Sequence, residues 1–114
     1  MNKTTYLSGK EVSDYIYKDL KKRIHILDEK KIKPALAVIL IGENPASKSY
    51  VRSKIKIFKK LNLYSKIFQL PQTTAEKEVL VLINKLNKNS NFHGILVQLP
   101  LPTHIDKEKI VFSI

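Results

Sequence analysis

Residues 35 to 47 read A-L-A-V-I-L-I-G-E-N-P-A-S, and this stretch decides the fold. The unbroken apolar run over 35–41 is typical of a strand that is buried on both faces of a parallel sheet. Asn44 is a favourable N-cap and Pro45 a favourable first helical residue, so a helix is expected soon after the strand. The stretch therefore predicts one strand–turn–helix unit of an α/β protein.

The rest of the chain continues this alternation. Ser8 with Glu11, and Thr73 with Glu76, have the spacing of capping boxes, and Asp106 is a favourable N-cap for a last helix. The expected elements, in chain order, are a helix over 9–29, a strand over 35–42, a helix over 46–62, a strand over 64–70, a helix after the second capping box, a strand over 93–99 and a final helix. This order predicts a three-layer α/β fold, a parallel sheet with helices on both faces.

Length and composition limit the classes of protein. A chain of 114 residues suits one domain, and the absence of cysteine excludes disulfides and thiolate metal sites. No histidine or carboxylate cluster has metal-ligand spacing, so no metal is expected. The start, M-N-K-T-T-Y-L-S-G-K, lacks the apolar core of a secretory signal, and no apolar run is long enough to cross a bilayer. The sequence predicts a cytoplasmic protein without a membrane segment.

The net charge of +11 raises nucleic-acid binding as an alternative function. Nineteen of the 21 basic residues are lysine, because only Arg23 and Arg52 are arginine. Proteins that read bases favour the bidentate guanidinium group, and here the lysines are spread along the chain without interleaved aromatic residues. A non-catalytic basic nucleic-acid-binding module is therefore kept only as the alternative.

Lys54 is the unusual cation of the helix expected over 46–62. At about 100° per residue, Lys54 falls within the apolar arc that contains Val51 and Phe58, and it shares this arc with Ser47 and Tyr50. One interpretation is that Lys54 buries its stem at the edge of the core and keeps its ammonium group in water. The other is a lysine held in a cleft for proton transfer, since its helix begins where ligands bind in α/β sheets, beyond the carboxyl end of a strand.

Gln98 is the second unusual residue, because it interrupts the apolar run G-I-L-V-Q-L-P-L-P over 94–102. A buried amide needs hydrogen-bond partners. It can bond to the backbone where the strand ends, or it can reach the same cleft as Lys54. Pro100 and Pro102 cannot donate backbone hydrogen bonds and end the strand with a stiff turn. Such a segment can form the wall of a flat ligand site, but by itself it is more often only a loop.

The stretches G-E-N-P-A-S-K-S-Y-V-R-S-K-I-K (42–56) and G-I-L-V-Q-L-P-L-P (94–102) together resemble the bifunctional methylenetetrahydrofolate dehydrogenase/methenyltetrahydrofolate cyclohydrolase family. The resemblance covers essentially the whole chain. It implies an enzyme of one-carbon metabolism and purine biosynthesis. Such an enzyme oxidises 5,10-methylenetetrahydrofolate and hydrolyses the methenyl product to 10-formyltetrahydrofolate.

The resemblance also implies roles for individual residues. Lys54 would be the general acid/base, and Tyr50 would stack on the folate. Gln98 would bond to the lysine and help to place the reacting water. The other residues that the resemblance places around the substrate are Ser47, Leu99, Pro100 and Pro102.

The resemblance implies an NADP-binding Rossmann domain and a homodimer in the full-length family. This chain has glycine only at positions 9, 42 and 94 and stops before the family's D-x-D-G segment. We therefore expect residues 1–114 to be the catalytic, substrate-binding domain, with the NADP-binding domain absent and no cofactor-binding residue in this chain. An inactive remnant is the other alternative. A short-chain dehydrogenase, which shares the Tyr-x-x-x-Lys spacing, is set aside because no glycine-rich turn precedes Tyr50.

Overall fold

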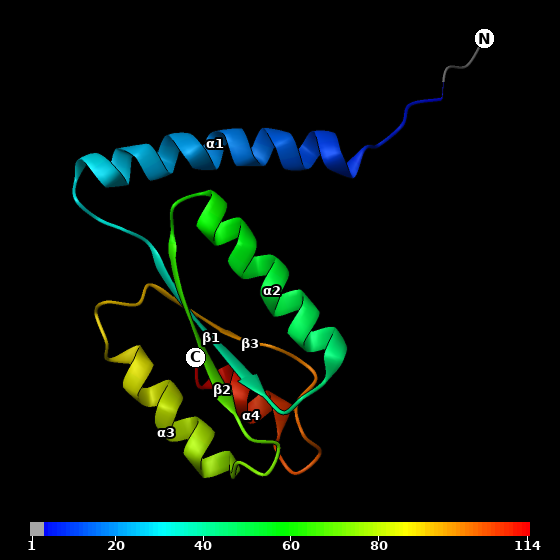
Figure 1. The fold of residues 1–114 in the computed structure, drawn as a ribbon, viewed down its shortest axis with the longest axis vertical. Coiled ribbons are helices and arrows are strands. Elements are labelled where there is room, and N and C mark those ends of the chain that lie inside the picture. Colours follow the sequence, from blue (N-terminus) through cyan, green and yellow to red (C-terminus); the bar gives the residue numbers. More distant parts are fainter. Residues whose placement is uncertain (1–3) are drawn as a thin grey trace. The chain divides into compact units, whose positions relative to one another are not determined.

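The structure, a computed structural model, describes residues 4–114 and divides the chain into two compact units between Lys33 and Pro34. The elements follow one another in the predicted order (Figure 1). The first unit contains α1, Gly9–Glu29. The second contains β1 (Ala35–Ile41), α2 (Pro45–Lys60), β2 (Tyr64–Leu70), α3 (Glu76–Asn87), β3 (Gly94–Val97) and α4 (Lys107–Phe112).

The first unit is an amphipathic helix with defined ends. Ser8 Oγ accepts a hydrogen bond of 3.4 Å from the backbone N–H of Glu11, so the predicted N-cap is confirmed. At the other end Lys31 has φ 59°, and the N–H of Ile32 reaches back to the carbonyl of Leu27 in a Schellman motif. An apolar groove runs along the helix surface and is lined by Gly9, Val12, Ser13, Ile16, Tyr17 and Leu20.

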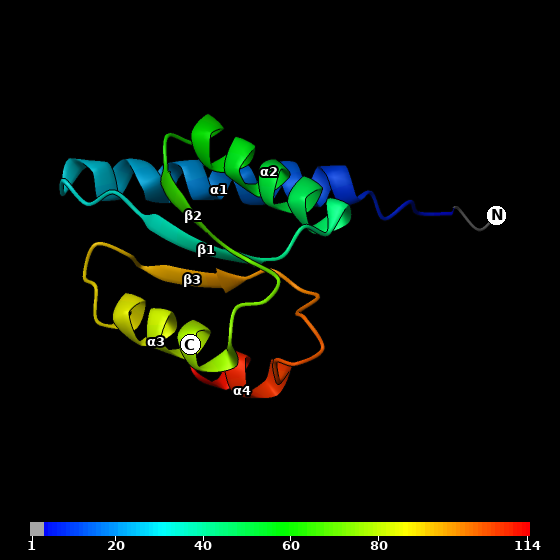
Figure 2. The ribbon, with the colours of Figure 1, turned by 60° about the horizontal axis from the view of Figure 1, so that its bottom comes forward.

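The second unit is built on a parallel sheet with the strand order β2-β1-β3 (Figure 2). Val38 in the central strand lies opposite Ile67 of β2 and Leu96 of β3. Six of the seven residues of β1 are buried, as its continuously apolar sequence predicts. Since all three strands run the same way, the segments that follow them leave the same edge of the sheet.

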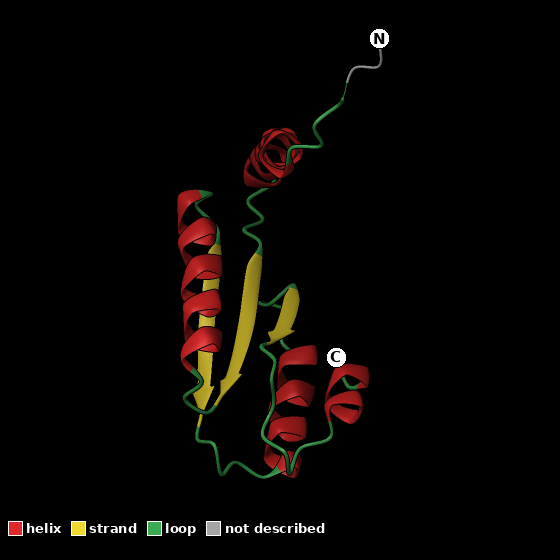
Figure 3. Ribbon diagram, turned by 90° about the vertical axis from the view of Figure 1, so that its right-hand side faces the viewer, coloured by secondary structure: helices red, strands yellow, loops and turns green. Residues whose placement is uncertain are grey.

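Helices cover both faces of this sheet, so the predicted three-layer architecture is confirmed (Figure 3). Val38 and Leu40 point to one face and pack with Val51 of α2. The alternate positions of β1 point to the other face, where they pack with α3 and α4. The buried residues of that second core are Ala37, Ile39, Ile41, Val79, Ile83, Leu86, Ile105 and Ile110.

Two local predictions are corrected. The strand expected over 93–99 is shorter, Gly94–Val97, and its residues are only partly buried, because within the described residues β3 pairs with β1 alone and forms an edge. The capping box of Thr73 with Glu76 is also wrong. Ala75 is the N-cap of α3 and makes no side-chain capping bond, while the Glu76 carboxylate accepts from the backbone N–H of Asp106 instead.

Candidate functional site

The start of α2 and the segment after β3 come together at the carboxyl edge of the sheet (Figure 1). Asn44 Oδ1 accepts a 3.1 Å hydrogen bond from the N–H of Ser47, which confirms Asn44 as the N-cap of α2. Ser47 is buried, and its hydroxyl donates to the carbonyl of Leu99 at 3.2 Å. One polar side chain thus joins the first turn of α2 to the residues directly beyond β3.

Lys54 and Gln98 form the central contact of the site. The ammonium group of Lys54 donates to Gln98 Oε1 at 2.7 Å, and Lys54 is half-buried. Gln98 is 9% exposed, and its Nε2 donates to the carbonyl of Leu99 at 3.0 Å. The backbone N–H of Gln98 also donates to the carbonyl of Ile39, so hydrogen bonds fix both the main chain and the side chain of Gln98. The amide oxygen of Gln98 therefore faces Lys54 in a defined orientation.

Tyr50 lies one turn before Lys54 on α2 and is 59% exposed. Its side chain makes no hydrogen bond within residues 4–114, so both its ring and its hydroxyl are open to a ligand. Leu99 and Pro100 are also exposed, and a cis peptide bond joins them. Pro102 is buried, so it supports the segment from beneath and presents little surface to solvent.

Most other cations of α2 behave as the helical wheel predicts. Arg52, Lys56, Lys59 and Lys60 are exposed. Lys48 is half-buried and forms an ion pair with the exposed Glu43 in the turn before the helix. Lys54 differs from it, because its ammonium group bonds to a buried side chain, that of Gln98. The position of Lys48 in the first turn, within reach of Glu43, was the signal for this pair.

The end of β2 and the turn after it contribute two polar side chains that the sequence did not single out. Gln69 Nε2 donates to the carbonyl of Gly42 and to Glu43 Oε1, both at 3.4 Å. Gln72 lies over Gly42, whose φ is +90°, and a Cβ at Gly42 would meet Gln72 Oε1 at 1.8 Å. Amides at and just beyond the carboxyl end of a strand that neighbours β1 in a parallel sheet are the signal that predicts this cluster.

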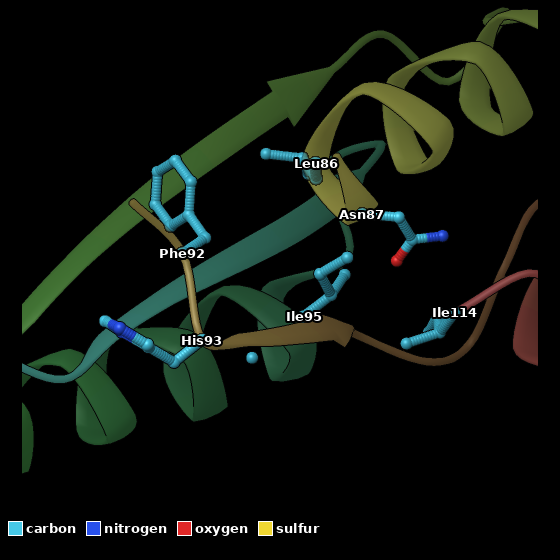
Figure 4. A pocket seen from close by; sticks show the side chains of 7 residues that line it. Leu86, Asn87, Phe92, His93, Ile95 and Ile114 are labelled. Atoms are coloured by element: carbon cyan, nitrogen blue, oxygen red, sulfur yellow. The ribbon is translucent and has the colours of Figure 1, made fainter. Parts of the chain in front are cut away.

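Other regions of the described chain contain fewer candidate functional groups. Residues 4–114 contain no group of three or more histidines and carboxylates placed to hold a metal ion. None of their helices has the length and apolar character needed to span a bilayer. A cavity of about 200 Å³ lies at the amino end of β3, away from Lys54 (Figure 4). Its lining consists of Leu86, Asn87, Phe92, His93, Gly94, Ile95 and Ile114, none of them a predicted site residue.

The sequence of residues 7–114 matches the family described as "Tetrahydrofolate dehydrogenase/cyclohydrolase, catalytic domain". The chain belongs to this family. It is 46% identical over 111 residues to the bifunctional protein FolD of Enterococcus faecalis, covering 97% of this chain and 40% of that protein. It is 48% identical over 108 residues to FolD of Exiguobacterium sibiricum, covering 95% of this chain and 39% of the relative. The chain thus spans about 40% of the length of the relatives it matches.

Solved structures agree with this membership of the tetrahydrofolate dehydrogenase/cyclohydrolase family. The FolD crystal structure from Campylobacter jejuni superposes with a TM-score of 0.92 at 46% identity, covering 96% of this chain and 39% of that one. The FolD structure from Trypanosoma brucei, solved in complex with NADP cofactor and inhibitor, gives a TM-score of 0.86 at 30% identity. It covers all of this chain and 39% of that one. The fold predicted for this chain is therefore the fold of the matching part of FolD.

Proposed function

We propose that residues 1–114 form the substrate domain of a methylenetetrahydrofolate dehydrogenase/methenyltetrahydrofolate cyclohydrolase, and that this domain binds a tetrahydrofolate derivative at the carboxyl edge of its sheet. The observation that supports this most directly is the 2.7 Å bond from Lys54 to Gln98. It places a cation and an oriented amide together at the edge where α/β proteins bind ligands. The exposed ring of Tyr50 one turn away supplies a stacking face for a flat pterin or aminobenzoate ring.

The reaction that this arrangement suits best is hydrolysis of 5,10-methenyltetrahydrofolate to 10-formyltetrahydrofolate. Water adds to the methenyl carbon and loses one proton. The bond from that carbon to N5 then breaks as N5 takes up a proton, and the remaining hydroxyl releases its proton to solvent to leave the formyl C=O. Lys54, held as an ammonium donor by Gln98, is the acid for the departing nitrogen. Once neutral, it is the base for the next water. Gln98 keeps the lysine in place and offers an amide to the reacting water.

The surrounding residues have supporting roles in this proposal. Ser47 and Gln98 both donate to the carbonyl of Leu99, which fixes the start of the segment that follows β3. Leu99 and Pro100 are exposed beside this network and provide the wall against which the folate lies. Pro102, which is buried, holds the wall from behind.

The described residues do not fit a dinucleotide such as the NADP bound in the T. brucei relative. A pyrophosphate needs an open glycine-rich turn between a strand and a helix. The turn after β1 has a single glycine, Gly42, and the side chain of Gln72 covers it. For the dehydrogenase reaction we therefore propose only that this chain binds the folate substrate, and we assign hydride transfer to none of its residues.

The direct test is hydrolysis of 5,10-methenyltetrahydrofolate by the purified chain, followed by the loss of the substrate's absorbance. Lys54→Met removes the proton-transfer group, and the rate should fall by about 10² to 10⁴. Lys56→Met is the matched control, because Lys56 is an exposed lysine of the same helix. Its rate should stay within about twofold of the wild type. Equal rates for Lys54→Met and the wild type would remove Lys54 from the mechanism.

Two further expectations rest on the family resemblance alone. We infer that the full-length protein forms a homodimer and acts in the cytoplasm. Light scattering on the full-length protein tests the first expectation, since a dimer gives twice the chain mass. Fractionation of cells tests the second.

A further inference from the structure

The segment from Gln98 to Asp106, here called the site loop, is held at both ends. Its first residues are bonded to α2, through Lys54 to Gln98 and through Ser47 to Leu99. Its last residue, Asp106, donates its backbone N–H to Glu76 Oε2 at 2.8 Å. Two different helices, on opposite faces of the sheet, thus determine where the site loop lies.

Glu76 is the main contact at the far end. It is the first residue of α3, and its side chain is 25% exposed. One carboxylate oxygen accepts from Asp106, and the other lies 3.2 Å from Lys109 Nζ in α4. Beside this contact His104 Nε2 lies 2.8 Å from the carbonyl of Thr74, the residue before the N-cap of α3. The start of α3 therefore holds the site loop by two separate hydrogen bonds.

The middle of the site loop has little freedom to absorb a displacement of its far end. Pro102 and Ile105 are buried, and the N–H of Ile105 donates to the carbonyl of Pro102 at 3.0 Å. Proline has a fixed φ, so the two prolines stiffen the backbone between Leu99 and Pro102. A shift at Asp106 is expected to pass through this turn to Leu99 and Pro100, the exposed wall of the candidate site.

We propose that Glu76 is a positioning residue, which fixes the far end of the site loop and thereby the place of Leu99 and Pro100 against a bound folate. The proposal rests on the function proposed above. Its basis is that both carboxylate oxygens of Glu76 contact other segments, namely the site loop and α4. The position of Glu76 in the sequence instead predicts that its side chain caps its own helix. The pKa of Glu76 is lowered by the N–H of Asp106 and then by Lys109, which agrees with a carboxylate held in this contact.

A second bond between α3 and α4 provides a matched control. Asn87 Nδ2, at the end of α3, donates to the carbonyl of Ser113 at 2.8 Å. This bond joins the same two helices as Glu76 does, but at their other ends, away from the site loop. Asn87→Ala therefore weakens the docking of α4 without releasing Asp106.

The experiment compares Glu76→Ala, Glu76→Gln and Asn87→Ala with the wild type, using hydrolysis of 5,10-methenyltetrahydrofolate by the full chain. Glu76→Ala should raise KM about tenfold, because the wall moves, while kcat stays within about threefold, because Lys54 and Gln98 are held by α2. Glu76→Gln keeps an oxygen that can accept from Asp106, so its KM should stay within about twofold. Asn87→Ala should leave both constants unchanged.

Amide hydrogen exchange on the same proteins tests the positioning role without any activity. In Glu76→Ala the amide of Ile105 should exchange about tenfold faster, whereas the amide of Gln98, which donates to Ile39, should keep its rate. Asn87→Ala should change neither amide. Unchanged exchange at Ile105 overturns the proposal, and so does faster exchange with an unchanged KM, because Glu76 then contributes to stability alone. If the wild type does not hydrolyse the substrate, the proposed function fails, and exchange at Ile105 still decides whether Glu76 holds the site loop.

Discussion

Lys54 and Gln98 are 44 residues apart in the sequence, yet the ammonium group of Lys54 donates to the side-chain oxygen of Gln98 at 2.7 Å. Gln98 lies directly after β3, and Lys54 lies on α2, the helix that starts beyond the carboxyl end of β1. Because β1 and β3 are parallel neighbours, these two positions meet at one edge of the sheet. The topology is thus the reason that two polar residues in apolar patterns become partners.

Gln98→Met tests whether this pair matters for chemistry. The variant removes the acceptor of Lys54 but keeps a side chain of similar length, so the lysine loses its fixed position. We expect methenyltetrahydrofolate hydrolysis to fall by about 10²-fold. Gln69→Met, which changes an amide at the end of β2 without touching Lys54, should stay within about threefold. A Gln98→Met variant with the wild-type rate would contradict a role for this pair in the proposed hydrolysis.

Ser47→Ala tests the hydrogen bond between α2 and the site loop. Ser47 is 2% exposed, and its hydroxyl donates to Leu99, which also accepts from Gln98. Removing the hydroxyl should lower the free energy of unfolding by about 1 kcal/mol, the usual net contribution of one hydrogen bond. Urea unfolding measures this difference. Ser53→Ala is the control, because Ser53 is exposed on the same helix and should change stability by less than about 0.5 kcal/mol. An equal loss in both variants would contradict a specific role for the Ser47 hydroxyl.

The fold was predictable from sequence because its signals are local and repeated. The apolar run of β1, the N-caps Ser8, Asn44 and Asp106, and the helical spacing of apolar residues each depend on a few neighbouring residues, and the structure bears them out. The alternation of strands and helices then leaves a parallel sheet as the simplest topology. Lys54 was found for the same reason, since a helical wheel needs only the residues of one helix.

The contacts between elements were not predictable in this way. Thr73 and Glu76 have capping-box spacing, but the Glu76 carboxylate bonds to Asp106, thirty residues later in the chain. A sequence pattern contains information on the helix that a residue begins. It contains none on a backbone N–H that the fold brings next to that residue from a distant part of the chain. The ion pair of Lys48 was missed because a wheel assigns only a direction to the side chain, whereas a long lysine in the first turn can fold back to Glu43. A tertiary partner decides the first case, and a partner five residues earlier in the chain decides the second.

Gly42→Ala separates two possible costs at the turn after β1. Gly42 has φ +90°, which side chains rarely adopt, and a Cβ there would collide with the end of the Gln72 side chain. The backbone conformation should cost about 1–2 kcal/mol, whereas the tip of Gln72 can rotate away at little cost. Gly42→Ala should therefore lower the free energy of unfolding by about 1–2 kcal/mol in urea. Adding Gln72→Ala should restore less than about 0.5 kcal/mol. Full recovery in the double variant would show that the collision, and not φ, is the cause.

Two Schellman motifs end with residues other than glycine, and they predict a graded response. Lys31 after α1 has φ 59°, and Asn62 after α2 has φ 56°. A positive φ has no conformational free-energy cost for glycine, a small cost for asparagine and a larger cost for lysine. Lys31→Gly should therefore stabilise α1 by about 1 kcal/mol, and Asn62→Gly should stabilise α2 by only a few tenths. Thermal melts followed by circular dichroism measure both changes. Lys31→Ala is the control for the lost charge and should bring no gain, so a gain equal to that of Lys31→Gly would contradict the conformational explanation.

The lowered pKa of Glu76 predicts how the hold on the site loop depends on pH. The N–H of Asp106 is the main cause, followed by Lys109, and both favour the ionised carboxylate over its ordinary pKa of 4.5. A carboxyl group whose pKa is depressed in the folded state contributes its full stability above its unfolded pKa, and loses it as the pH falls through the folded pKa. The contribution of Glu76 should be complete at neutral pH and should disappear in acid, as the pH falls below the ordinary pKa and through the lowered pKa of the folded state.

Urea unfolding of the wild type and of Glu76→Gln over this pH range measures the effect. The wild type should be the more stable protein at neutral pH, and the difference should shrink as the solution is acidified. Glu78→Gln is the matched control, because Glu78 is an exposed carboxylate of the same helix, and its difference from the wild type should not follow this course. A Glu76→Gln difference that is the same at neutral and acid pH would show that the charge of Glu76 does not contribute to the bond with Asp106. The effect of Glu76 on the site loop would then rest on hydrogen-bond geometry alone.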